Sequence, residues 1–183
     1  MNSKISQFIY DAALEISIKI KSNFSGENTE ASTNENIKDF LIKAKYTLEE
    51  IYNKIEIIHQ NLITEGSLPF VDKIIVDCEH VLISINSINL KIEILIINGI
   101  SKIQASSALI KSLFCEFLNK LKLLCEEELK RPTIEIICDD QLKAFFIRIM
   151  CYMELFKTLF STLVLQMLEL SAGTFLNTLY CTL

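Results

Sequence analysis

A chain of 183 residues is long enough to bury a sizeable core, and we expect residues 1–183 to form a single domain. Its formal net charge is −5 and its lysine and arginine residues form no basic stripe, which argues against a binding face for nucleic acid. Half of the residues are hydrophobic and only 22% are charged, which indicates a thick core, a hidden interface, or both.

The N-terminal segment predicts a short amphipathic helix over residues 3–22. Its apolar residues recur at helical spacing, and they are Ile5, Phe8, Ile9, Ala12, Ala13, Ile16 and Ile20. Residues 21–34 are polar and rich in Ser, Thr and Asn, so we expect a flexible linker there.

Two long helices are predicted next, over residues 35–62 and 70–97. In each, apolar residues alternate by steps of three and four, the spacing of a coiled-coil seam. The first seam consists of Ile37, Leu41, Ala44, Leu48, Ile51, Ile55, Ile58 and Leu62. The second consists of Val71, Ile75, Cys78, Leu82, Ile85, Asn89, Ile92 and Ile96.

Asn89 is the one polar residue in the second seam. A polar residue at such a position can set the register or the number of partner helices. A helix break at Asn86 and Ser87 is an alternative explanation of its polarity. Because residues 90–94 alternate like a strand and β-branched residues are dense here, the pattern leaves residues 86–98 open as helix or strand.

The same period predicts two further helices, over residues 101–130 and 140–171. We expect Ala172 and Gly173 to end the last one. The seam residues of the first are Ile103, Ser107, Ile110, Phe114, Phe117, Leu121 and Leu124. Those of the second are Leu142, Phe146, Ile149, Met153, Phe156, Phe160, Leu163, Met167 and Leu170.

The last helix is apolar enough to raise the question of a membrane span. Arg148, Glu154, Lys157 and Glu169 interrupt it, and its longest uncharged stretch, residues 158–168, is about half of the roughly 20 residues that a spanning helix needs. The segment is therefore not expected to be transmembrane.

Apolar residues also occur away from the seam of the last helix, at Ile147, Met150, Leu165 and Leu168. A helix that is apolar nearly all round is either the centre of its own bundle or offers a second face to a partner. We take these four residues as a candidate interaction face.

Four long helices with one period and a shorter N-terminal helix predict an all-α protein, an antiparallel bundle of about five helices. Catalytic signatures are missing from the sequence, which contains no CxxC, P-loop, GxGxxG or GxSxG motif. The two histidines, His59 and His80, lie in no metal-ligand spacing. We therefore expect no enzymatic activity, no catalytic residue, no metal site, no cofactor and no small-molecule substrate.

Six cysteines occur without a secretory signal before them, and most lie on apolar helical faces. This setting favours free thiols in the cytoplasm or another reducing intracellular compartment. Isoleucine, asparagine and lysine are frequent, which suggests an AT-rich genome such as that of a virus or an intracellular parasite.

The sequence thus predicts a non-enzymatic protein that acts through apolar helix faces, either by binding another protein or by self-assembly into a homo-oligomer. One alternative is a bundle that binds lipid or a membrane surface, since lipid-carrying five-helix bundles share the length and helix count. Another is a redox or metal site built from cysteines.

A further alternative is a groove that binds a partner helix, as in the Bcl family of apoptosis regulators. The chain resembles viral members of that family in length, in its helical pattern and in having one very apolar helix. It contains no Trp, and therefore lacks the Asn-Trp-Gly-Arg signature of the family.

Overall fold

The structure is a computed structural model. It describes the backbone of residues 2–24, 36–65, 69–98, 106–130 and 139–182. Side chains are described for residues 4–24, 36–64, 71–97, 106–130 and 143–167.

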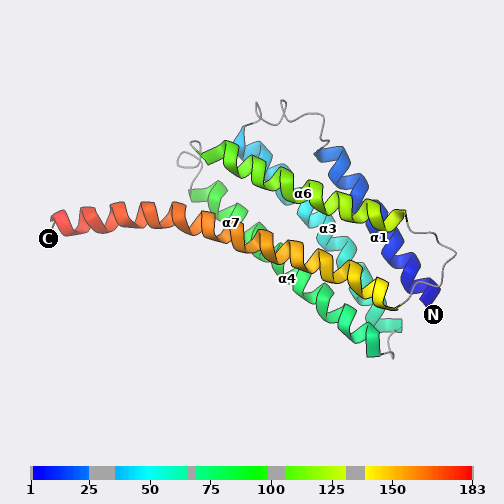
Figure 1. Ribbon diagram of the computed structural model, residues 1–183. Helices are drawn as coiled ribbons and strands as arrows, with labels where there is room; N and C mark the ends of the chain where they lie inside the picture. Colours follow the sequence, from blue (N-terminus) through cyan, green and yellow to red (C-terminus); the bar gives the residue numbers. More distant parts are fainter. Residues whose placement is uncertain (1, 25–35, 66–68, 99–105, 131–138, 183) are drawn as a thin grey trace.

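Five helices account for nearly all of the described residues, and they pack into one bundle (Figure 1). They are α1 (Asn2–Asn23), α3 (Ile37–Glu65), α4 (Pro69–Asn98), α6 (Ser107–Leu129) and α7 (Asp139–Thr182). No strand occurs in the described part of the chain. The prediction of an all-α bundle of about five helices is confirmed.

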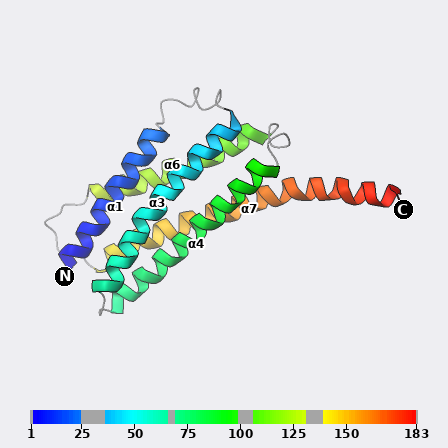
Figure 2. The ribbon, with the colours of Figure 1, turned by 180° about the vertical axis from the view of Figure 1, so that it is seen from behind.

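Each helix packs on two main neighbours, in the closed order α1, α3, α4, α7, α6 and back to α1. Helices that follow one another along the chain run in opposite directions (Figures 1 and 2). In a closed ring with an odd number of helices, the helix directions cannot alternate all the way round, so one neighbouring pair has to be parallel. That pair is α4 and α7, which also share the most extensive contact in the bundle.

The core is formed by the seams that the sequence predicts. All eight seam residues of α3, from Ile37 to Leu62, are buried. Phenylalanines fill the space between α3, α6 and α7, where Phe114 lies with its ring centroid 4.8 Å from that of Phe156 and 5.0 Å from that of Phe160. Phe40 of α3 joins the cluster edge-on to Phe114. The described part of each seam therefore faces the interior, apart from a few residues that are half-buried at its margin.

Most helix boundaries agree with the predicted ones to within a few residues. Residues 86–98, left open as helix or strand, are helical throughout because they form the last turns of α4. Helix α6 begins at Ser107 rather than at residue 101, and residues 99–105 lie outside the described part. The linker predicted at residues 21–34 overlaps the end of α1, which continues to Asn23. Residues 25–35 lie outside the described part of the chain.

The expected end of the last helix at Ala172 and Gly173 is wrong, since α7 continues to Thr182. A single Gly costs a helix only about 1 kcal/mol relative to Ala, which is too little to stop a helix by itself. Proline, which costs about 3 kcal/mol, is absent from α7.

Helix α7 is much longer than its neighbours. It has 44 residues, or about 66 Å at about 1.5 Å per residue, whereas α4, the next longest, has 30 residues and spans about 45 Å. The C-terminal part of α7 projects beyond the end of the bundle, with no other helix beside it (Figures 1 and 2). Val164 is the last buried residue among the described side chains of α7. We call residues 168–182 the projecting end of α7.

Candidate interaction surface on helices α4 and α7

The outward side of α7 is largely apolar. Ile147, Leu155, Leu159 and Leu165 are exposed there, with 56% of both Leu155 and Leu165 accessible to solvent. Cys151 is exposed between them as a free thiol. Exposed apolar residues that gather along one helix are more informative than the same residues scattered singly over a surface.

Two threonines on this side add less polarity than their hydroxyl groups suggest. Thr158 Oγ1 donates a hydrogen bond to the carbonyl oxygen of Glu154 at 2.9 Å, and Thr162 Oγ1 donates to that of Thr158, also at 2.9 Å. Because both hydroxyl protons are used within the helix, covering these residues leaves no hydroxyl donor unpaired.

Helix α4 presents a second apolar row. Val76, Ile83, Leu90 and Ile97 are all exposed and follow one another at intervals of seven residues, which places them on one side of the helix. Ile97 is 79% exposed. Since α4 and α7 are neighbours in the ring, their outward sides adjoin. We call the exposed apolar residues of both helices the α4/α7 outer surface.

Polar side chains connect the two helices beneath this surface. Ser84 Oγ of α4 donates to Glu154 Oε1 of α7 at 2.8 Å, and Lys157 Nζ lies 2.8 Å from Glu154 Oε2. These two donors, Lys157 first, hold the pKa of the Glu154 carboxyl below its usual value. The carboxylate of Glu154 thereby fixes α7 against α4.

Lys91 lies at the same boundary without a carboxylate partner among the described residues. Its Nζ donates to Ser87 Oγ at 2.7 Å. Partial burial lowers the pKa of the Lys91 ammonium, and repulsion from Lys157 lowers it further. Among the described side chains that interact with one another here, Lys91 and Lys157 are positive and only Glu154 is negative, so positive charge is in excess.

Of the four residues of the predicted interaction face, Ile147, Met150, Leu165 and Leu168, the three with described side chains differ in their exposure to solvent. Ile147 and Leu165 are exposed on the α4/α7 outer surface, as an interaction face requires. Met150 is half-buried and packs against the core. The backbone of Leu168 belongs to the projecting end of α7, and its side chain lies outside the described residues.

The row on α4 was not singled out from the sequence. Its signal was a second seven-residue repeat beside the seam, in the order Val76, Ile83, Leu90 and Ile97. Two apolar repeats on one helix can both be buried in a bundle, so the pattern does not show which of them remains exposed.

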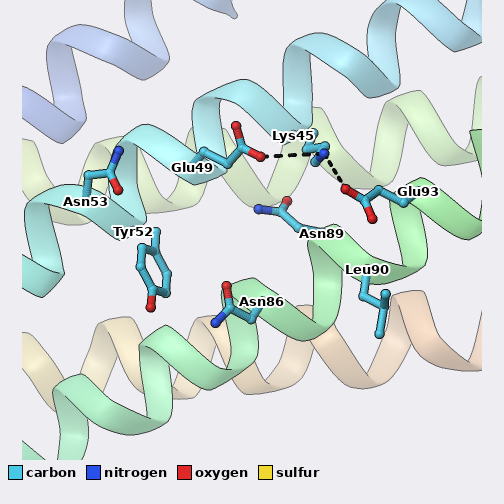
Figure 3. Close-up of a pocket in the computed structure, with 8 residues that line it drawn as sticks. All are labelled: Lys45, Glu49, Tyr52, Asn53, Asn86, Asn89, Leu90 and Glu93. Atoms are coloured by element: carbon cyan, nitrogen blue, oxygen red, sulfur yellow. Dashed lines mark hydrogen bonds and ion pairs between the residues drawn. The ribbon is translucent and has the colours of Figure 1, made fainter.

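A polar groove of about 420 Å³ lies between α3 and α4 (Figure 3). Lys45 Nζ of α3 lies 2.5 Å from Glu93 Oε1 of α4 and 3.6 Å from Glu49 Oε1 of α3. Asn89 is 9% exposed, and its Oδ1 atom is buried without a hydrogen-bond partner. The groove is lined by Lys45, Glu49, Tyr52, Asn53, Asn86, Asn89, Leu90 and Glu93.

The charges of this groove are engaged with one another, and the groove holds no nucleophile beside a base. Its ion pairs are partly exposed to solvent, where such pairs contribute little to stability. The unpartnered oxygen of Asn89 is inaccessible to a ligand because it is fully covered. We therefore interpret the groove as part of the contact between α3 and α4, and not as a binding site.

Other reactive groups are dispersed. In the described ranges, no three His, Cys, Asp or Glu side chains come together as a metal site would require. His59 Nε2 lies 3.1 Å from Glu79 Oε1 at the surface. Burial raises the pKa of the Cys125 thiol to about 12 and that of the Cys78 thiol further still, so both are poor nucleophiles near neutral pH.

One described helix segment, Val71–Ile97 in α4, is long and apolar enough to cross a membrane. Length and composition are the only grounds for this, and the core helix of a soluble protein meets the same criteria. It contains the buried seam of α4 as well as the exposed row.

Fold and surface together define a class, an all-α five-helix bundle with a two-helix apolar surface and a projecting C-terminal helix end. In comparisons with known proteins, no family model matches this chain, and no curated protein or solved structure is significantly similar to it.

Proposed function

We propose that this protein is a non-enzymatic interaction protein, which uses the α4/α7 outer surface and the projecting end of α7 to bind another protein chain. The observation that carries the proposal is the projection of α7 beyond its own bundle (Figure 1). An isolated helix of about 12–15 residues is only marginally stable in water, because helices in proteins are held mainly by packing. A helical projecting end is therefore expected where a partner packs against it.

The apolar residues of the outer surface support the same function. Leu155, Leu159 and Leu165 lie on the helix that forms the projecting end, so the exposed surface and the projection are continuous. Exposed apolar residues that gather on neighbouring helices mark interaction sites in soluble proteins. Amphipathic helices commonly bind such surfaces through residues spaced by three, four and seven positions.

A pair of substitutions tests the proposal. Leu155→Lys with Leu165→Lys places two charges on the outer surface, while Ile57→Lys is a matched control on the exposed side of α3, where Ile57 is 53% exposed. Tagged wild-type protein and both variants are used to capture proteins from cells that express the untagged chain. Because all three positions are exposed, we expect the melting temperatures of the variants to stay close to that of the wild type.

We expect one or more captured proteins, the untagged chain included, to be lost with the double variant and retained with Ile57→Lys. Equal capture by the three proteins would contradict the proposal, because the surface would then take no part in binding.

Binding to a lipid surface is the second candidate, favoured by the apolar segment Val71–Ile97. Liposome flotation distinguishes it from protein binding. If wild-type protein floats with vesicles and the double variant does not, the α4/α7 outer surface binds lipid instead.

A further inference from the structure

We infer that the partner at this surface is a second copy of the chain, and that two copies of α7 pair in antiparallel orientation about a two-fold axis. This inference rests on the proposed function and names the occupant of the same surface.

The continuity of α7 makes the surface self-complementary. One helix carries both an exposed apolar side, at residues 147–165, and a projecting end, at residues 168–182. When two such helices pair in antiparallel orientation, the projecting end of each lies along the exposed side of the other. A two-fold pairing of this kind uses the same patch on both subunits and closes without leaving either end uncovered. A different protein would need to supply both a surface and a helix to achieve the same coverage.

Charge complementarity favours the same pairing. After Lys157 the sequence contains a single charged residue, Glu169. The α4/α7 boundary has an excess of positive charge, since Lys91 lacks a carboxylate partner among the described residues and is repelled by Lys157. In the sequence Glu169 follows Leu165 by four residues and Thr162 by seven, spacings that keep residues on one side of a helix. A carboxylate from a second copy would complement the lysines at this boundary.

The same charge argues against a bilayer as the occupant. Glu169 lies in the middle of the uncharged C-terminal sequence, and Gln166 and Asn177 add two polar amides to it. A carboxylate at the centre of a bilayer is costly, whereas at the boundary of two helices it can be paired.

Pairing Glu169 with Lys157 fixes the position of the two-fold axis. In an antiparallel pair the two-fold axis passes midway between two residues that contact each other across it. For Lys157 of one copy and Glu169 of the other, the midpoint is residue 163. Thr162 is the exposed residue next to it, and in the dimer each Thr162 lies about 3 Å along the helix axis from its copy, at about 1.5 Å per residue. Thr158, one turn earlier, lies about 15 Å from its copy.

These two threonines give a matched cross-linking test, since both are exposed and both hydroxyls bond within the helix. Each is changed to Cys in a background where Cys138, Cys151 and Cys181 are replaced by Ser. A disulfide needs Cα atoms within about 7 Å, so we expect Thr162→Cys to form a covalent dimer under mild oxidation and Thr158→Cys to form little. Equal cross-linking at both positions would overturn the register.

Light scattering of the purified full-length chain measures the association itself. We expect a measured molar mass of twice the chain mass of 20.9 kDa. We expect Glu169→Lys to raise the dissociation constant of the dimer at least tenfold. Combining Glu169→Lys with Lys157→Glu exchanges the two charges of the pair that sets the axis, and is expected to restore part of the affinity. Failure of Glu169→Lys to weaken the dimer would contradict the charge pairing.

A purified chain that stays monomeric at all concentrations overturns the inference. If the Leu155→Lys and Leu165→Lys double variant still loses a captured protein in cells, the proposed function stands with a different partner. If that variant loses no captured protein either, both fail. Flotation of the wild-type chain with phosphatidylcholine and phosphatidylglycerol vesicles would assign the surface to lipid.

Discussion

Asn89 shows how a single polar residue sits inside an otherwise apolar seam. It lies on α4 where α4 meets α3, it is 9% exposed, and its Oδ1 atom has no hydrogen-bond partner (Figure 3). A buried polar atom without a partner costs about 1–3 kcal/mol. The sequence-based role for Asn89, setting the register of helix pairing, stays a prediction, and substitution tests it.

We expect Asn89→Leu to raise the free energy of unfolding by about 1 kcal/mol, because it removes the unpartnered oxygen and keeps a similar volume. Asn86→Leu, at an exposed position in the same groove, is the control and should change it by less than about 0.5 kcal/mol. Urea denaturation followed by circular dichroism measures both. A loss of stability in Asn89→Leu would show that the amide holds α3 against α4.

At the scale of elements, the phenylalanine cluster joins helices that are distant in sequence. Phe117 of α6 stacks on Phe156 of α7 with ring centroids 4.1 Å apart, and Phe114 contacts rings of both α3 and α7. Aromatic pairs contribute about 0.5–1.5 kcal/mol beyond the area that they bury. Helix α6 lies between α1 and α7 in the ring, and Phe114 and Phe117 hold it against α3 and α7.

Phe114→Ala should lower the free energy of unfolding by about 3–5 kcal/mol, since it opens a cavity in this cluster. Leu109→Ala is the control on the same helix, where Leu109 is 58% exposed, and it should cost less than about 0.5 kcal/mol. Thermal and chemical denaturation compare the two variants. Similar losses from both would mean that the cluster does not organise α6.

At the scale of the whole molecule, the bundle and the projecting end of α7 have separate contributions to stability. The C-terminal part of α7 lies beyond the end of the bundle (Figures 1 and 2), and Val164 is the last buried residue among the described side chains of α7. The parallel pair of α4 and α7 is held by the buried seams and by the link from Ser84 to Glu154. None of these contacts involves the projecting end.

A chain that ends after Met167 should therefore keep the bundle. We expect its melting temperature to lie within about 4 °C of the full-length monomer, which corresponds to about 1 kcal/mol for a protein of this size. Its helical signal should fall only by the contribution of the removed residues, and its association should be lost. Scanning calorimetry at low concentration, with light scattering, checks these outcomes, and a broad non-cooperative transition would place the projecting end within the folding unit.

The amino-acid sequence by itself determined the helical class and the buried seams. Leu41, Leu48 and Ile55 lie at intervals of seven and are all buried, as the pattern predicts. This succeeded because the period of an amphipathic helix is a local property, which depends only on the spacing of apolar residues along one element. Two of the four residues of the predicted interaction face, Ile147 and Leu165, are exposed, and their role in binding stays a prediction.

Only the tertiary structure decided which apolar faces are left uncovered and how far the last helix extends. Val76 and Ile83 look no different in sequence from their buried neighbours Ile74 and Val81, and the ring order alone exposes one row and covers the other. The failure of Ala172 and Gly173 to end α7 has a related cause, since a small local preference does not fix a helix end. Burial depends on contacts between residues far apart in the chain, and the spacing within one helix does not contain that information.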